Sequence, residues 1–526
     1  MPPTVEPLTN VDAAWLGMED PTNLMMVSGI MTFDRPLNLD HLKAILTHRF
    51  LKFERFRQRV IQPKLRVAPP YWETDRHFNL DAHLHRIALP EPGDQAALQT
   101  LASDLMSTPL DFSKPLWQVH IIDNYGDGGA IMMRLHHSIA DGIALMSVLL
   151  ALADFSADAP WPQADSAADA ESEPDKAEFG GMLGAMIKQA SSTVKAARKM
   201  TGKVVQEGLE AIIAPAKILD LALQGTDNAL AFSRLVLRSP DSKTIFKGEL
   251  GVAKRAAWSR SIPLKEIKAI KNVTGGTVND VLVAALTGSL RRYLLDRGQS
   301  VDGLTFRAFV PVDIRGPDER MTLGNKFSLV FLPLPIDKAD PLERLEAVRA
   351  KMDALKKSPE VPVAFTILKG IGMSPEELHD VLVKMFGSKA SAVLTNVPGP
   401  PIPLYLAGGK IKDIMFWVPQ SGRVSLGLSI ISYAGKVQLG VASDVGLVPD
   451  PEKIIEGFYT EHEAYLALAR QAEEAEADLE KQTETERQTE TAIEDLGQCQ
   501  GTTKSGRRCR NRALADSEFC RMHRNS

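Results

Sequence analysis

The chain has 526 residues, more than one hydrophobic core normally serves, so we expect two or more domains. Hydrophobic residues make up 44% and charged residues 24%, which is the balance of a soluble globular protein. The formal net charge of -5 argues against nucleic acid as a partner of the main body and leaves room only for a local basic patch.

Targeting signals and cysteines narrow the class further. No apolar run reaches the roughly 18 residues that a bilayer-spanning helix needs. The start, MPPTVEPLTN, lacks the basic and apolar regions of a secretory signal, so we expect a cytoplasmic protein. Residues 1–498 contain no cysteine, which excludes a disulfide framework and a cysteine nucleophile in the main body.

Composition divides the chain into five parts. Residues 158–181 are rich in Pro, Ala and acidic side chains without an apolar period, and residues 471–495 carry ten acidic and two basic residues. The net charge of residues 496–526 is positive, because they contain seven Lys or Arg and two acidic residues. We predict an N-terminal half over 1–157, a linker with amphipathic helices over 158–240, a C-terminal half over 241–470, an acidic linker over 471–495 and a tail over 496–526.

In the first half, an apolar segment and a helix flank a polar motif. GGAIMMRLHH (128–137) is too short for a helix and is typical of a buried strand. DGIALMSVLLALADF (141–155) is apolar nearly all round, as a core helix is. Between the halves, residues 182–213 combine an apolar helical stripe with lysines on another face. Both a bridging helix and an interfacial helix in a lipid headgroup layer fit this pattern.

The second half also mixes helices and strands. A helix is predicted over 277–298, ending at Gly298, and strands over 304–313 and 327–336. A hairpin is predicted to turn at Ala434-Gly435, and a further helix to begin at Asp450-Pro451. Both halves therefore belong to the mixed α/β class.

The motif HHSIADG (136–142) is the first candidate site. Adjacent side chains on a strand point to opposite faces, and no HExxH motif is present, so a shared metal ion is improbable. There is no G-x-S-x-G elbow and no cysteine to form an acyl-enzyme. A neutral imidazole can accept a proton from a hydroxyl directly. Taken alone, a histidine pair is more often structural than catalytic, and the Asp-Gly that follows does not settle the choice.

HHSIADG matches the HHxxxDG motif of the CoA-dependent acyltransferase superfamily. Over about residues 6 to 470 the chain resembles the bacterial wax ester synthase/diacylglycerol acyltransferase family. The segments that carry this resemblance occur in the family's order: LTNVDAAWLGMED (8–20), DFSKPLWQVHIID (111–123), TVNDVLVAALTGSLRRYL (277–294), VPVDIR (310–315), LGNKFS (323–328), TNVPGPPIPLYLAGGKI (395–411) and SYAGKVQLGVASD (432–444).

The resemblance implies two chloramphenicol-acetyltransferase-like halves of mixed α/β structure with a tunnel between them. It implies an O-acyltransferase that needs no catalytic cofactor. Acyl-CoA would be the donor, and a long-chain alcohol or diacylglycerol the acceptor, without an acyl-enzyme. Its expected surroundings are the inner face of a membrane or a lipid inclusion, contacted peripherally. A relative that acylates another alcohol or an amine, and an idle lipid-binding protein of the same fold, stay open as alternatives.

The resemblance also assigns the two histidines and a carboxylate. His137 would be the general base that deprotonates the attacking hydroxyl and returns the proton to the leaving thiolate. His136 is expected to be structural. Asp141 would point away from the substrate and hold its loop through an arginine, for which Arg315 in VPVDIR is the candidate.

Residues outside the histidine motif complete the expected site. Asn279 and Asp280 match the family's ND motif, with Asn279 either an oxyanion donor or a loop anchor. Trp15 and Trp117 are expected in the core or as tunnel lining. The chain has Asp313 where the family often has Ser, a departure that could alter acceptor preference.

The tail carries a second candidate site. Cys499, Cys509, Cys520 and His523 are separated by nine, ten and two residues, and Cys3His is a known structural zinc set. The opening CQGTTKSGRRC resembles small knuckle-like modules that are appended to unrelated proteins. A zinc ion would explain how so short a segment stays folded. A disordered tail with incidental thiols stays open as the alternative.

Overall fold

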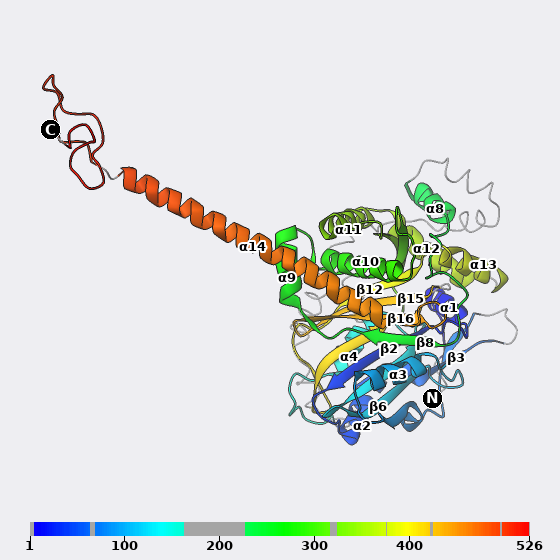
Figure 1. The fold of residues 1–526 in the computed structure, drawn as a ribbon. Helices are drawn as coiled ribbons and strands as arrows, with labels where there is room; N and C mark the ends of the chain where they lie inside the picture. Colours follow the sequence, from blue (N-terminus) through cyan, green and yellow to red (C-terminus); the bar gives the residue numbers. More distant parts are fainter. Residues whose placement is uncertain are drawn as a thin grey trace.

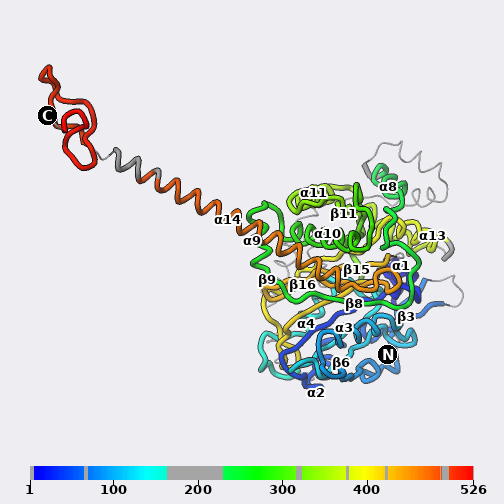
Figure 2. Tube along the Cα trace, in the orientation of Figure 1, coloured from blue at the N-terminus to red at the C-terminus, as the bar shows by residue number. Residues whose placement is uncertain are grey.

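The structure, a computed structural model, describes residues 5–63, 69–162, 227–315, 323–374, 376–420, 424–494 and 497–524. The amphipathic stretch predicted over 182–213 lies outside these residues. Figure 1 shows the N-terminal part (blue to cyan) packed against the C-terminal part (green to yellow), with one long helix projecting from the body. The tube in Figure 2 shows the chain passing from one part to the other. Among the described helices, none combines the length and apolar composition that crossing a bilayer requires.

A six-stranded sheet, in the order β13-β14-β2-β7-β6-β5, forms the centre of the first part. The strand predicted over 128–137 is β7 (Gly128–His136), and nearly all its residues are buried, which explains its continuous apolar run. The helix predicted after the motif is α4 (Gly142–Leu152). The other elements are β2 (Met26–Phe33), β5 (Leu84–Ala88), β6 (Trp117–Tyr125), α1 (Asn10–Gly17), α2 (Leu39–His48), α3 (Gln95–Met106), 3-10 turns at Phe50–Lys52, Glu54–Arg57 and Leu80–His83, and a small sheet of β1 (Val5–Pro7), β4 (Tyr71–Thr74) and β3 (Gln58–Ile61).

Two strands of this sheet come from the C-terminal part of the chain. β14 (Gly409–Trp417) pairs antiparallel with β2, with Ile414 opposite Met31, and β13 (Tyr405–Leu406) pairs with β14. Without β14 the unpaired edge of β2 would be exposed, which is a liability for any sheet. The segment that follows residue 400 therefore ties the two parts together through backbone hydrogen bonds.

The second sheet is mixed, in the order β11-β10-β12-β15-β16-β8, with β9 also paired to β16. The predicted hairpin is β15 (Leu426–Tyr433) and β16 (Lys436–Asp444). Its turn residues Ala434 and Gly435 have φ of 46° and 76°, as the favoured two-residue hairpin turn requires. The predicted mixed α/β class is confirmed. The remaining strands are β8 (Lys254–Trp258), β9 (Ile262–Pro263), β10 (Thr305–Asp313), β11 (Phe327–Pro335) and β12 (Ala392–Pro398).

Helices cover the second sheet. The predicted helix is α10 (Val278–Asp296), and it begins with a capping box in which Thr277 and Asp280 exchange side-chain and backbone hydrogen bonds. Arg344 and Glu461 form a buried ion pair that joins two neighbouring helices beside it. The other helices are α8 (Asp227–Leu237), α9 (Leu264–Thr274), α11 (Pro341–Lys356), α12 (Glu360–Met373), α13 (Glu376–Gly387) and α14 (Glu452–Glu494).

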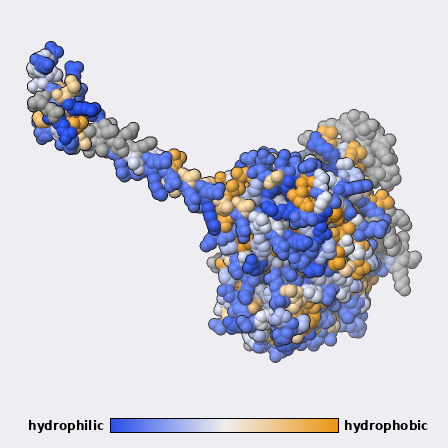
Figure 3. Space-filling view, viewed as in Figure 1, coloured by the Kyte–Doolittle hydropathy of each residue, from blue (hydrophilic) through white to orange (hydrophobic). Residues whose placement is uncertain are grey.

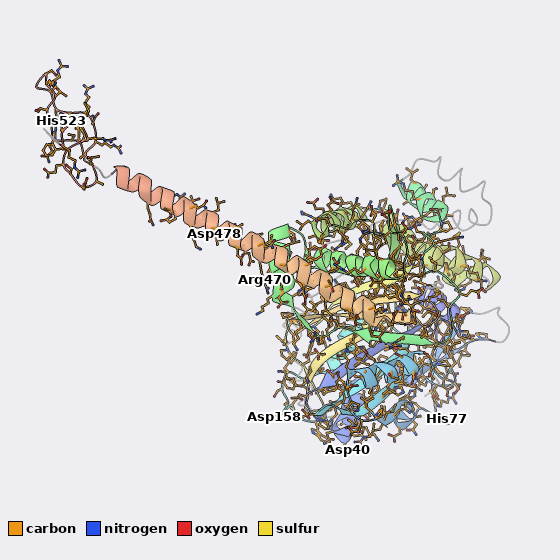
Figure 4. All side chains as sticks on the ribbon, viewed as in Figure 1. Asp40, His77, Asp158, Arg470, Asp478 and His523 are labelled. Atoms are coloured by element: carbon orange, nitrogen blue, oxygen red, sulfur yellow. The ribbon has the colours of Figure 1, made fainter. Side chains whose placement is uncertain are left out.

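The long helix α14 has a packed and an exposed section. Phe458 and Tyr465 are buried, whereas the described side chains beyond Arg470 are almost all exposed. Most of the segment predicted as an acidic linker belongs to this helix. The segment can be helical because it lacks Gly and Pro and is rich in the strong helix formers Ala, Glu and Gln. Figure 3 shows this section as largely hydrophilic, and Figure 4 places Arg470 and Asp478 along it and His523 beyond its end.

Candidate active site and metal cluster

The motif HHSIADG forms the turn between β7 and α4. His136 is the last residue of β7 and lies opposite Met26 of β2. The backbone N–H of His137 donates to the carbonyl of Met25 at 2.7 Å, so the turn stays attached to the sheet edge. The two histidine side chains are both buried.

The side chain of His136 is held within the fold through Nδ1. Its Nδ1 accepts the backbone N–H of Ser138 at 3.1 Å and lies 2.7 Å from the Ser138 hydroxyl. Because Nδ1 is an acceptor, the proton belongs on Nε2, which faces the Glu19 carboxylate at 3.5 Å. These contacts support the expectation that His136 is structural.

The imidazole of His137 lies among aromatic rings. It stacks on the Trp15 indole with ring centroids 4.2 Å apart and an interplanar angle of 16°, and the Phe327 ring lies 5.6 Å away. Burial lowers the pKa of His137 to about 4, against the opposing effect of the Asp141 carboxylate. The imidazole is therefore neutral near pH 7, which is the state that can accept a proton.

Asp141 points away from His137 and uses both carboxylate oxygens. Oδ1 accepts the N–H groups of Ile143 and Ala144 at 3.2 and 3.1 Å, and so caps the N-terminus of α4. Oδ2 accepts from the guanidinium of Arg315 at 2.7 Å and from the backbone N–H of Lys326 at 3.0 Å. The structure thus brings together the pair suggested by the resemblance, and the geometry fits a support role.

Arg315 is the centre of a small polar network. Its side chain is fully buried, and its guanidinium also contacts Asp313 at 3.2 Å and the carbonyl of Gly324 at 2.7 Å. The aspartate that replaces the family's frequent Ser is therefore a second carboxylate on the same arginine. Burial raises the pKa of Asp313, and the positive charge of Arg315 opposes that shift.

Sequence reasoning missed Asn325, Asp12 and the role of Trp15. The Asn325 side-chain amide donates to Asp12 Oδ1 at 2.7 Å and to the carbonyl of His137 at 2.8 Å. Asp12 and Trp15 are three residues apart on α1, so they share a helix face. The sequence offered one clue to the two polar residues. Asp12 lies in the family-like segment LTNVDAAWLGMED, and Asn325 lies in the family-like segment LGNKFS.

Asn279 and Asp280 lie at the start of α10. The Asp280 carboxylate accepts from the backbone and hydroxyl of Thr277 at 2.8 Å, and Asn279 Oδ1 accepts from the Asn396 amide at 2.6 Å. No hydrogen bond or ion pair joins either residue to His137 within the ranges that the structure describes. These contacts indicate that Asn279 and Asp280 anchor the start of α10. A role for either residue in catalysis stays a prediction.

An apolar pocket of about 540 Å³, including space open to solvent, shares its hydrophobic cluster with Trp15 and Phe327, the two rings that pack on His137. Met18, which lines it, follows Trp15 by three residues on α1. Leu329 and Phe331, which also line it, follow Phe327 at alternate positions of β11 and so share its face of the sheet. The remaining wall comes from α8, α12 and α13, including Leu235, Ile367 and Phe386.

A second pocket, of about 410 Å³, lies between the two sheets on the His136 side. Met26, which pairs with His136, lines it together with Asn23, Ser28, Lys254 and Gln420. The Ser28 hydroxyl is buried and has no hydrogen-bond partner among the described residues. The wall of this pocket therefore contains polar groups, whereas the wall of the first pocket is apolar.

The four predicted tail ligands come together in the structure. The candidate ligand atoms of Cys499, Cys509, Cys520 and His523 all lie within 4.8 Å of one another. The Sγ atoms of Cys509 and Cys520 are 3.7 Å apart, close to the roughly 3.8 Å edge of a tetrahedron with 2.3 Å zinc–sulfur bonds. His523 Nδ1 lies 3.4 Å from Cys499 Sγ and 3.3 Å from Cys520 Sγ. The arrangement is a Cys3His cluster that could hold a metal ion.

Local geometry explains the tail sequence around this cluster. Backbone N–H groups of Gly501 and Cys520 point at Cys499 Sγ, at 3.4 and 3.0 Å, as donors that would stabilise a thiolate. A Cβ at Gly501 would lie only 2.5 Å from the His523 ring, so the C-x-G opening requires glycine. A disordered tail with incidental thiols has no reason to satisfy these constraints.

We expect Asp141→Asn to lower the free energy of unfolding by about 3 kcal/mol, because it leaves the buried charge of Arg315 with the more distant Asp313 as its remaining described carboxylate partner. Chemical denaturation measures this loss. Asp478→Asn, which removes an exposed carboxylate on α14, serves as control and should cost less than about 1 kcal/mol. Unchanged stability together with an altered pH profile of turnover would assign Asp141 to proton transfer instead.

Comparison with known proteins agrees with this geometry. The family model described as the wax ester synthase/diacylglycerol acyltransferase catalytic domain matches residues 8–282, and the WS/DGAT C-terminal domain model matches residues 323–464. A Mycobacterium tuberculosis protein named a probable diacylglycerol O-acyltransferase is 27% identical over 458 residues, 86% of this chain and 93% of that protein. A Mycobacterium bovis protein with the same activity in its name is 28% identical over 466 residues, 84% and 95% of the two chains.

Solved structures show the same fold. The wax ester synthase/diacylglycerol acyltransferase from Marinobacter aquaeolei superposes with a TM-score of 0.62 at 23% identity, over 88% of this chain and 99% of that chain. The first condensation domain of the calcium-dependent antibiotic synthetase gives 0.52 at 17% identity, over 89% and 96% of the chains. Because the two family models together cover most of the chain, the protein belongs to the wax ester synthase/diacylglycerol acyltransferase family and is an O-acyltransferase that uses acyl-CoA.

Proposed function

We propose that the protein transfers a fatty acyl group from acyl-CoA to the hydroxyl of a long-chain alcohol, of diacylglycerol or of both, with His137 as general base. The observation that carries this proposal is a neutral, buried imidazole packed on Trp15 and Phe327, which share a hydrophobic cluster with the walls of an apolar pocket. The pocket suits a hydrocarbon chain, because each buried CH2 contributes about 0.8 kcal/mol. The family's activity and the names of the relatives support the choice of substrates.

In the proposed reaction the acceptor hydroxyl oxygen attacks the thioester carbonyl carbon. The new carbon–oxygen bond forms as the hydroxyl proton moves to His137, and the carbon–sulfur bond then breaks. Protonated His137 returns the proton to the CoA thiolate, so the base is regenerated and no protein ester forms. Asp141, directed away by Arg315, holds the turn without taking the proton.

The two pockets suit the two kinds of ligand. Asn23, Ser28 and Gln420 offer amide and hydroxyl groups in the smaller pocket, which fits the amide-bearing arm of CoA. The larger pocket is lined almost entirely by apolar side chains and fits the hydrocarbon part of a substrate. In the proposed reaction, the thioester and the hydroxyl meet at His137.

We expect His137→Ala to lower kcat by at least about 10²-fold, the effect of losing a general base, with acyl-CoA affinity nearly unchanged. The assay follows thiol release from palmitoyl-CoA with hexadecanol or dioleoylglycerol as acceptor. Since a base must be neutral and the pKa of His137 is about 4, kcat/KM for the acceptor should stay level from about pH 8 to about pH 5 and fall below about pH 4.

Two results would contradict this assignment. Equal losses in folded His136→Ala and His137→Ala proteins would mean that the roles within the pair are wrong. Absence of thiol release with either acceptor would favour the acylation of another alcohol or amine, or an idle lipid-binding protein.

We propose further that the protein contacts a lipid surface at the rim of the larger pocket. Exposed apolar side chains gather on the helices that line this pocket: Leu237 of α8 is 62% exposed, Met373 of α12 55% and Val381 of α13 57%. Figure 3 shows hydrophobic surface on the side of the body that carries α12 and α13. Apolar side chains grouped around an apolar pocket are typical of a surface that meets lipid.

Replacing Leu237, Met373 and Val381 with Gln should reduce flotation with phosphatidylglycerol-containing liposomes, and should reduce acylation of a short, soluble alcohol much less. Val273 and Leu295, 40% and 46% exposed on α9 and α10, supply the matched control when replaced in the same way. Unchanged flotation would place the lipid contact elsewhere, and the predicted interfacial helix over 182–213 would be the next segment to alter.

We propose zinc as the metal of the Cys3His cluster. Three soft thiolates with one imidazole suit Zn²⁺ in a closed structural site. The four ligands come from a segment of fewer than 30 residues, so metal binding would supply much of its folding free energy.

Metal analysis should find one zinc per protein, and none after truncation at Asp495 or in Cys509→Ser. A chelator should unfold residues 497–524, seen as loss of their amide protection, and leave the catalytic body intact. Acyltransfer should survive, because the exposed section of α14 separates the cluster from the active site. No zinc in the full-length protein, or equal zinc after truncation, would refute the site.

A further inference from the structure

We propose that Asp12 and Asn325 are positioning residues for His137: Asp12 orients the Asn325 amide, which holds the His137 carbonyl and accepts a hydrogen bond from ring Nδ1–H, leaving Nε2 as the base. This inference rests on the proposed role of His137 as the base. It concerns the tautomer and direction of the imidazole, which neither the histidine motif nor the Asp141 pair determines.

The orientation of the Asn325 amide is unambiguous. Its Nδ2 lies 2.7 Å from Asp12 Oδ1 and 2.8 Å from the His137 carbonyl oxygen. The backbone carbonyl is only an acceptor and the Asp12 carboxylate acts as one, so the NH2 group must face them. Exchange of the amide oxygen and nitrogen would place oxygen against oxygen at both contacts. Asn325 Oδ1 therefore points away from these two partners.

Two buried atoms at this position lack partners. Asn325 Oδ1 and His137 Nδ1 are both buried without a hydrogen bond to any described residue. A buried polar atom without a hydrogen bond destabilises the fold, because it has lost its contact with water. Asn325 Oδ1 is an acceptor, and His137 Nδ1 becomes a donor when it carries the ring proton. A hydrogen bond from Nδ1–H to Oδ1 satisfies both, and such bonds often tighten only when substrate binds.

The Asn325 side chain also affects the protonation of the ring. Burial lowers the pKa of His137, and the Asp141 charge, the backbone of His137 itself and the Asn325 side chain all oppose that shift. On the ring face, Trp15 stacks at 4.2 Å. Helix α1 thus acts on the imidazole twice, through Trp15 directly and through Asp12 and Asn325.

Single substitutions should lower kcat far more than they change KM for acyl-CoA. We expect Asn325→Ala and Asp12→Ala each to lower kcat by on the order of 10²-fold through misorientation of the base. The double variant should be little worse than either single variant, because the two residues act through one chain of contacts. Asp12→Asn keeps an acceptor oxygen and should retain most of the turnover.

Nitrogen-15 NMR of labelled histidine reads the tautomer directly, with His137→Gln to assign the signal. Folded wild-type protein should show Nδ1–H at His137, and Asn325→Ala should shift the population toward Nε2–H. Gln438→Ala is the matched control, because it removes a similarly buried amide, on β16, that donates to the backbone carbonyl of Ser259. It should change neither the tautomer nor kcat.

The outcomes separate this inference from the proposed function. Nε2–H at His137 in the wild-type protein would overturn the positioning role, even if Asn325→Ala does not fold. Full turnover in folded Asn325→Ala would overturn it too, while His137→Ala would still test the base. Full turnover in His137→Ala would refute the proposed function itself.

Discussion

The buried ion pair between Arg315 and Asp141 is the interaction on which the site depends. Their side chains are 0% and 6% exposed, so separating them would leave a buried charge without its main partner. The pair joins the turn of HHSIADG, in the first part of the chain, to residues 313–315 and 323–326 of the second. Around it, Lys326 donates to Asp141, Asn325 holds His137, and Ala140 bridges Gly324. The catalytic turn is therefore shaped by the contact between the two parts.

Burial serves two purposes at this contact. Trp15 and Phe327, which pack on the neutral imidazole of His137, belong to the hydrophobic cluster that also lines the apolar pocket. In the proposed reaction, one desolvated region therefore holds both the base and the hydrocarbon chain. Asp141 lies only four residues from His137, but its charge is neutralised by Arg315 and directed at α4. The Asp141 charge still raises the pKa of His137, but burial lowers it by more, so the imidazole stays neutral near pH 7.

The tail is physically separate from this chemistry. The exposed section of α14 carries the Cys3His cluster away from the body, as Figure 1 shows. Its many glutamates stay in water, while the cluster forms its own small core from three buried cysteines. Among the described residues, the tail cluster thus has a core of its own, separate from the hydrophobic cores of the body.

The sequence by itself determined the features that depend on neighbouring residues: strand β7 and helix α4 around the motif, the capping box of α10, the Ala434-Gly435 turn and the four cluster ligands. Local spacing and backbone preference decide these. Only the tertiary structure decided that β14 completes the first sheet, that Trp15 stacks on His137, and that Asn325 bonds to Asp12 across 313 positions. Such pairings depend on how distant surfaces pack, and a local pattern carries no information about which buried polar group will face which.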